Sequence, residues 1–201
     1  MNTAPSLPDT LLTQARAGDA HAFAALVRAH QGSVFSIGLR MLSRRDAAED
    51  LAQDVFLQLY RKLGDIESLE HLGFWLRRVA SNLAIDWIRR RPYTTTQPLD
   101  EGEQVVAQQT EEDPLMDREL QRLMNDLAPP ARAVMLLRYQ EDRDLAEIGA
   151  MLDMPVNTVK SHIKRSLTAL RSRMVGAKLI DCEPEDMRPE AMRPEEMRKS
   201  P

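Results

Sequence analysis

The chain has 201 residues, 43% of them hydrophobic and 29% charged, and it carries a formal net charge of −4. This length suggests one or two domains, and the composition is ordinary for a soluble globular protein. No stretch approaches the ~18 apolar residues that cross a membrane, no secretory signal opens the sequence, and a single cysteine, Cys182, excludes a disulfide framework. We therefore expect a cytoplasmic protein without membrane insertion.

A first helical unit is predicted over residues 10–92, where apolar residues recur at helical spacing. Gly18 and Asp19 separate two helices, and Gly32 is expected to kink or interrupt the second of them. The low aromatic content of 4% also favours helices over sheets.

Two further helices of this unit are delimited by polar segments. Ser43 or Asp46 is expected to cap the first of them, and Gly64 to end it. A loop over residues 64–73 then leads into the second, which Pro92 stops. The buried stripe of the first of these helices is formed by Leu51, Val55, Leu59 and Leu63.

An acidic linker and a second helical unit complete the expected fold. Residues 93–113 show no sustained periodicity and few large apolar side chains, so we expect a flexible linker. Residues 114–176 form the second helical unit. The tail over residues 177–201 repeats loosely as EDMRP, EAMRP and EEMRK, and its prolines predict a mobile or extended segment. The prediction is thus an all-α protein of two small helical domains.

Charge is segregated along the chain in a way that the net value conceals. Residues 154–180 hold six basic residues and no acid, and residues 74–91 hold five arginines against Asp86 alone. Residues 100–119 hold eight carboxylates and one arginine. Because a phosphate responds to the local field, the two basic stretches remain candidates for nucleic-acid contacts, although a solvated helix face explains any one of them.

The sharpest local pattern lies between Asp144 and Leu170. A short apolar helix is followed by the break Asp153-Met154-Pro155 and by a second helix with Val159 on its buried stripe. Two short helices joined by a tight turn form a helix-turn-helix, whose second helix can enter the major groove of DNA. A plain helical hairpin within a bundle would give the same apolar stripes.

The opposite face of that second helix carries side chains suited to reading DNA. Asparagine can bond adenine edges, lysine and arginine reach guanine acceptors or phosphates, and serine serves either. Thr158, near the start, is expected to help cap the helix. The candidate residues are Asn157, Thr158, Lys160, Ser161, Lys164 and Arg165.

The helix over residues 74–91 is the second candidate. We expect Trp75, Leu76, Val79, Leu83 and Trp87 to face a core. Arginines and an amide lie on another face and suit a DNA backbone and unpaired bases. The tryptophans are most simply core residues, and the arginines alone would also fit a solvated face.

Carboxylates three or four residues apart share a helix face near residue 50. They are Asp46, Glu49, Asp50 and Asp54. No histidine completes a metal site, so a docking face for another protein is the preferred interpretation, with plain solvation as the alternative. A metal-dependent hydrolase built on these four acids is a remote third function.

In their order these segments resemble the extracytoplasmic-function group of bacterial sigma factors. DAAEDLAQDVFLQLYRKL is similar to the family's region 2.2, which binds the clamp helices of the RNA polymerase β′ subunit. FWLRRVASNLAIDWIRRR resembles regions 2.3 and 2.4, which melt and read the promoter −10 element. LAPPARAVMLLRYQEDRDLAEIGAMLDMPVNTVKSHIKRSLTALR resembles region 4, which reads the −35 element and contacts the β flap.

The resemblance implies a role for each matching position. The polymerase-docking residues would be Glu49, Asp50, Gln53, Asp54 and Phe56. The −10 residues would be Trp75, Arg77, Arg78, Asn82, Arg89 and Arg90. The −35 residues would be the six candidates of the recognition helix. The family uses no cofactor, is not an enzyme, and is commonly held inactive by an anti-sigma factor.

Two positions depart from the family pattern. Asp153 stands where the turn often has glycine, but aspartate tolerates left-handed backbone angles. Gly149 stands where alanine is usual, which costs about 1 kcal/mol of helix propensity but allows a close approach. The leading alternative to a sigma factor is a stand-alone helix-turn-helix regulator, which would bind a specific duplex tightly without polymerase.

Overall fold

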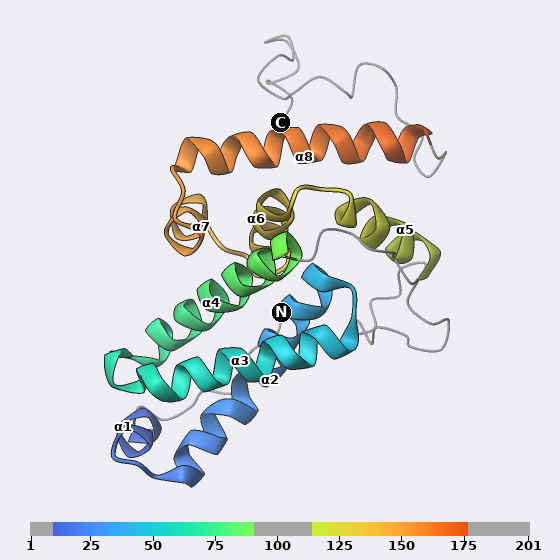
Figure 1. The fold of residues 1–201 in the computed structure, drawn as a ribbon. Coiled ribbons are helices and arrows are strands. Elements are labelled where there is room, and N and C mark those ends of the chain that lie inside the picture. Colours follow the sequence, from blue (N-terminus) through green and yellow to red (C-terminus); the bar gives the residue numbers. More distant parts are fainter. Residues whose placement is uncertain (1–9, 91–113, 177–201) are drawn as a thin grey trace, which may run out of the picture.

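The computed structural model describes residues 10–90 and 114–176 (Figure 1). Within these ranges the chain is helical and contains no strand. Its first half consists of α1 (Thr10–Arg16), α2 (Ala20–Leu42), α3 (Arg45–Lys62), the short 3-10 helix η1 (Leu63–Asp65) and α4 (Leu69–Arg90). Its second half consists of α5 (Pro114–Asn125), α6 (Pro129–Tyr139), α7 (Leu145–Leu152) and α8 (Val156–Gly176).

The long helix α2 runs without interruption through Gly32, so the expected interruption there is wrong. Gly32 is exposed, and the propensity cost of one glycine, about 1 kcal/mol, is small beside the apolar burial on either side of it. That burial comes from Leu26, Val34 and Ile37, each at most 1% exposed.

The boundaries of α3 and α4 also differ from the expectation. Neither Ser43 nor Asp46 caps α3, because Arg44 occupies the N-cap position and Ser43 ends α2 in a left-handed conformation. Helix α4 begins at Leu69, well inside the expected loop. The hydroxyl of Ser68 accepts a hydrogen bond of 3.0 Å from the backbone N–H of His71, which satisfies one of the free donors at the start of a helix.

The four residues of the predicted stripe are all buried, namely Leu51, Val55 and Leu59 of α3 and Leu63 at the start of η1. Helices α2 and α3 approach each other closely where Gly38 meets Ala48, with 3.3 Å between the Cβ of Ala48 and the position a Cβ on Gly38 would take. Helix α4 packs across this pair, as Figure 1 shows.

The second half contains the expected helix-turn-helix, formed by α7 and α8. Asp144 accepts hydrogen bonds from the N–H groups of Ala146 and Glu147, and the Glu147 side chain accepts from the Asp144 N–H, a capping box that fixes the start of α7. Asp153 ends α7 with a φ of 52°, the left-handed conformation expected of it. Pro129 and Pro130 lie in the first turn of α6 rather than in the preceding turn, where proline fits without loss of a helical hydrogen bond.

The two halves share one hydrophobic core. Leu72 and Leu76 of α4 and Ile37 of α2 belong to the same buried cluster as Leu137 of α6 and Met151 of α7. A smaller cluster joins α5, α6 and α8 through Leu123, Met135 and Leu170. Within residues 10–90 and 114–176 no helix is long and apolar enough to span a membrane. The expected linker (93–113) and tail (177–201) lie outside the described residues.

Two glycine-to-alanine changes should shift stability in opposite directions. A Cβ added at Gly32 meets nothing within 4 Å, whereas one at Gly149 would lie 2.8 Å from the carbonyl oxygen of Met154. We expect Gly32→Ala to raise the free energy of unfolding by about 0.5–1 kcal/mol. Gly149→Ala should lower it by about 1–3 kcal/mol, because the turn backbone must move.

Urea denaturation of both variants beside the wild type measures these shifts. A higher free energy of unfolding in Gly149→Ala than in the wild type would show that the turn backbone can move at little cost. The close approach at Met154 would then not constrain α7 and α8.

Candidate nucleic-acid interface

Helix α8 presents a basic, acid-free face to solvent. Val159 is fully buried and anchors the helix on α6 and α7. On the outward face Thr158 is half-buried and the other predicted residues are exposed, namely Asn157, Lys160, Ser161, Lys164 and Arg165. None of the carboxylates in the ion pairs of the described residues reaches Lys160, Lys164 or Arg165, so their charge is available to a phosphate or a base edge.

One residue of this face escaped the sequence analysis. Val156, the first residue of α8, is 38% exposed although it is apolar. Apolar side chains at the start of a recognition helix contact thymine methyl groups. The sequence could have indicated this residue, because Val156 directly follows the turn of the predicted helix-turn-helix.

Helix α4 carries the second basic face. Arg78, Arg89 and Arg90 are exposed, and Arg89 lies 3.9 Å from the exposed Asp86. Trp75 and Trp87 are half-buried against the core, as predicted, together with Val79 and Leu83, and Leu76 is buried. The exposed arginines suit a DNA backbone, and the two tryptophans of the same helix are only partly buried.

Two of the predicted α4 residues are engaged with the second half of the chain. The Arg77 guanidinium forms an ion pair with Glu141, with 2.6 Å between Nε and Oε2. The Asn82 amide donates to the carbonyl of Met151 at 2.9 Å, as well as to the carbonyl of Arg78 in its own helix. Met151 lies in the last turn of α7, where backbone carbonyls lack helical partners, so Asn82 supplies a donor that the helix end needs.

A reciprocal contact joins the second half to the end of α2. Arg132 of α6, only 4% exposed, donates from Nη1 to the carbonyl of Met41 at 2.7 Å and from Nη2 to the carbonyl of Asn125. Gln121 of α5 donates to the neighbouring Arg40 carbonyl at 3.0 Å. A cation at a helix C-terminus also interacts favourably with the helix dipole.

Helix α3 exposes the predicted docking face. Glu49, Asp50, Gln53 and Asp54 are exposed, and Glu49 pairs with Arg45 at 3.0 Å. Phe56 is instead half-buried and packs against the core, so only part of its surface is available to a partner.

Sequence reasoning missed two apolar members of this face, Leu57 and Tyr60, which are 53% and 68% exposed. Leu57 follows Asp54 at helical spacing outside the buried stripe, which was the available signal. Tyr60 also contacts Phe23 of α2 in an edge-to-face arrangement with ring centroids 5.3 Å apart. Exposed apolar side chains among carboxylates are typical of a protein-binding surface.

The acidic cluster does not converge on one point. Asp46 forms an exposed ion pair with Arg44, whose hydrogen bond lowers the pKa of the Asp46 carboxyl and raises that of the Arg44 guanidinium. Within the described ranges, no group of three histidine, cysteine or acidic side chains is arranged to hold a metal ion.

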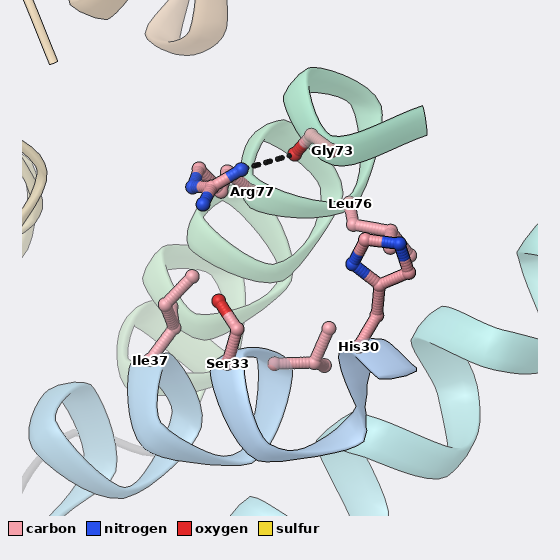
Figure 2. A pocket seen from close by; sticks show the side chains of 7 residues that line it. His30, Ser33, Ile37, Gly73, Leu76 and Arg77 are labelled. Carbon is pink, nitrogen blue, oxygen red and sulfur yellow. Dashed lines mark hydrogen bonds between the residues drawn. The ribbon is translucent and has the colours of Figure 1, made fainter. Parts of the chain in front are cut away.

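A small pocket lies between α2 and α4 (Figure 2). His30 and Ser33 of α2 face Gly73, Leu76 and Arg77 of α4 across it. Its volume is about 10 Å³, room for about one water molecule, so it is no substrate site. Burial and the nearby Arg77 lower the pKa of His30, whose Nε2 is buried without a hydrogen-bond partner.

Comparison with known proteins identifies two family regions in this chain. Residues 26–92 match Sigma-70 region 2, and residues 117–170 match Sigma-70, region 4. The ECF RNA polymerase sigma factor SigW of Bacillus subtilis is 32% identical over 176 residues, which cover 81% of this chain and 94% of SigW. The ECF RNA polymerase sigma factor SigE of Mycolicibacterium smegmatis is 32% identical over 152 residues, covering 73% of this chain and 59% of SigE.

Two solved structures share the fold. CnrH in complex with the cytosolic domain of CnrY is 21% identical with a TM-score of 0.59, covering 83% of this chain and 96% of CnrH. The sigma factor RpoE in complex with the anti-sigma factor NepR from Bartonella quintana is 18% identical with a TM-score of 0.54, covering 71% of this chain and 89% of RpoE.

Acidification should destabilise the protein through His30. In the folded protein its pKa lies below the unfolded value of about 6.5, so the unfolded chain binds the proton more readily as the pH falls. The free energy of unfolding should therefore decrease as the pH falls through about 6.5 and level off below the folded pKa. Urea denaturation at pH 7.5 and pH 5.5 measures this loss.

The control is His30→Gln, which removes this titration and leaves every other ionisable group in place. The loss between the two pH values should be smaller in the variant. An equal loss in both proteins would assign the pH dependence to other groups.

Proposed function

Because the chain belongs to the extracytoplasmic-function group of the sigma-70 family and so acts as an RNA polymerase sigma factor, we propose how its exposed faces divide that work. The segment 10–92 docks on core polymerase and traps the opened −10 strand. The segment 114–176 reads the −35 element as duplex DNA and meets the β flap. The factor acts by binding, without catalysis of its own.

The observation that carries this proposal is that α8, the second helix of a helix-turn-helix, exposes a basic face without acidic residues. The capping box at Asp144 and the left-handed turn at Asp153 delimit α7 and its short connection to α8, which supports a DNA-reading helix-turn-helix. The side chains that reach outward are the asparagine, serine, lysines and arginine that duplex recognition requires. Since the order of the matched regions is that of the family, the same chain supplies both promoter contacts.

Docking on polymerase is assigned to the exposed face of α3. Asp50, Gln53 and Asp54 provide charge complementarity, and Leu57 and Tyr60 beside them provide apolar contact area. The α4 residues Trp75, Arg78, Arg89 and Arg90 are assigned to the −10 strand, with Arg77 and Asn82 joining them when they are released from the second half.

An anti-sigma factor is the expected regulatory partner. One of the two solved structures that share the fold holds the sigma factor RpoE in complex with the anti-sigma factor NepR, and the other holds CnrH in complex with the cytosolic domain of CnrY. The exposed apolar and acidic side chains of α3 give such a partner a surface that competes directly with polymerase.

Size-exclusion chromatography with purified bacterial core RNA polymerase tests the proposal. Stoichiometric co-elution is expected. A folded chain that stays separate from polymerase and binds one duplex tightly by itself would instead favour the stand-alone regulator.

Replacing Lys164 by alanine should weaken promoter recognition without affecting polymerase binding. Removing one lysine contact to a base edge or phosphate should lower DNA affinity by about 5- to 100-fold. Promoter binding by the reconstituted holoenzyme, on a sequence selected from random duplexes, measures the change.

Arg28→Ala is the matched control, because Arg28 is an exposed cation of α2 outside all three faces. Equal promoter binding by the Lys164 variant and the wild type would remove Lys164 from the recognition face.

Replacing Asp54 by alanine should have the complementary effect. We expect core polymerase to bind the variant about 10-fold more weakly, since one charge of a complementary pair is lost. Fluorescence titration of labelled protein with core polymerase measures the affinity, and Glu67→Ala removes an exposed carboxylate of the α3–α4 connection as the control. Wild-type affinity in the Asp54 variant would contradict the docking assignment.

A further inference from the structure

Val156 differs from the exposed apolar side chains of α3 in its electrostatic surroundings. Leu57 and Tyr60 are exposed on a helix that also exposes carboxylates, a setting that suits a protein partner. Val156 is 38% exposed at the start of α8, a helix that contains no acidic residue. Its neighbours Asn157 and Lys160 are exposed as well. DNA is the partner whose charge fits this second setting.

The turn between α7 and α8 fixes the place of Val156 (Figure 1). The N–H of Met154 donates to the carbonyl of Gly149 at 2.9 Å, and the carbonyl of Pro155 accepts from the N–H of Thr158 at 2.8 Å. The Cγ2 methyl of Val156 lies 3.8 Å from the position that a Cβ on Gly149 would take. One side of the valine therefore borders α7, and the rest of its surface is open to a ligand.

The side chain of Val156 is also stiff. A β-branched residue in a helix has one strongly preferred χ1 rotamer, so an interface that orders it loses little conformational entropy. Val159, in the same first turn, is fully buried and anchors this end of α8 on α6 and α7. Val156 is thus presented as a preformed apolar contact.

The start of the second helix is where a helix-turn-helix contacts base edges. The thymine 5-methyl is the one apolar group that the base pairs present in the major groove, and the other groups there are hydrogen-bond donors or acceptors. A valine side chain offers no hydrogen bond, so placing it against a donor or acceptor would leave that group without its water. The methyl of thymine is the base group that matches this side chain.

We propose that Val156 is a specificity-determining residue, which recognises one thymine of the −35 element through its 5-methyl group. This inference rests on the proposed function and deepens it. Val156 favours thymine over cytosine at that position, because cytosine lacks the methyl and presents an amino donor that valine cannot accept. Asn157 and Lys160 supply hydrogen bonds to neighbouring base edges or phosphates.

Replacing thymidine by deoxyuridine in the DNA tests the contact without changing the protein. Deoxyuridine keeps the pairing with adenine and every hydrogen-bonding group, and lacks only the 5-methyl. Each thymidine in the −35 element of a promoter selected from random duplexes is replaced in turn. Promoter binding by the reconstituted holoenzyme is then measured with the wild type and with Val156→Ala.

At one thymidine we expect deoxyuridine to weaken binding by the wild type about 2- to 5-fold, as for the loss of one buried methyl contact. Val156→Ala should bind the two duplexes equally, with about the affinity of the wild type for the deoxyuridine duplex. A general loss of folded protein would instead lower the active fraction alike for both duplexes.

Val175→Ala is the matched control. Val175 is a half-buried valine in the last turn of the same helix, so the variant makes the same chemical change far from the turn. It should keep the full sensitivity to the thymine methyl.

A second probe restores the methyl on a different base. Cytosine and 5-methylcytosine are compared at the sensitive position, each paired with guanine. Methylation should strengthen binding by the wild type and by Val175→Ala, and should leave binding by Val156→Ala unchanged.

Three results would overturn the proposal. One is a deoxyuridine series in which no position loses its effect in Val156→Ala. Another is an equal loss of affinity by Val156→Ala on the thymidine and deoxyuridine duplexes, which would assign the side chain to packing of the turn. The third is weaker binding of Val156→Ala to core polymerase without DNA, with sensitivity to the methyl retained, which would assign Val156 to a protein partner.

The design separates this inference from the proposed function. A wild-type chain that never joins core polymerase contradicts the proposed function, whereas the deoxyuridine series on the duplex that the free chain selects still tests Val156. Conversely, a holoenzyme that selects and binds its promoter without any position that depends on Val156 overturns this inference alone.

Discussion

The guanidinium of Arg132 finds hydrogen-bond acceptors in both halves of the chain, and its burial constrains how the two halves pack together. A charge removed from water is costly unless hydrogen bonds replace its hydration. At 4% exposure Arg132 finds such acceptors in the carbonyls of Met41 and Asn125. Met41 belongs to the last turn of α2, where carbonyls lack helical donors and carry partial negative charge. Helix end and arginine therefore satisfy each other only when the halves are packed together.

At α7 the roles are reversed, because the first half supplies the donor and the second half supplies the helix end. There the Asn82 amide of the first half reaches the last-turn carbonyl of Met151 in the second half. Each half thus supplies donors to a helix end of the other, across an apolar core that contributes most of the burial. Polar contacts of this kind contribute modest net free energy because water competes for the same groups. They define a particular arrangement while leaving separation possible, which a factor that must span two promoter elements requires.

The spacing of apolar residues in the sequence predicted those features of the fold that depend on residues close together in the chain. The α7–α8 motif, its left-handed Asp153 and the buried stripe of α3 follow from residues a few positions apart. The start of α4 was missed because a single serine, Ser68, supplies the hydrogen bond at its first turn. The effect of Gly32 was overestimated because tertiary burial on either side of it outweighs its low helix propensity. The pairs joining the halves, such as Arg77 and Glu141, are separated by 64 positions and leave no periodic trace in one sequence.

The packing of the two halves gives the charge distribution a physical meaning. A basic face without acids binds nucleic acid wherever it meets it, largely through phosphate contacts that carry no sequence information. In the packed arrangement the Glu141 carboxylate neutralises Arg77, one cation of the α4 face. Separating the two halves would leave this partly buried guanidinium without its carboxylate, so the ion pair favours the packed arrangement and restricts non-specific binding at this cation.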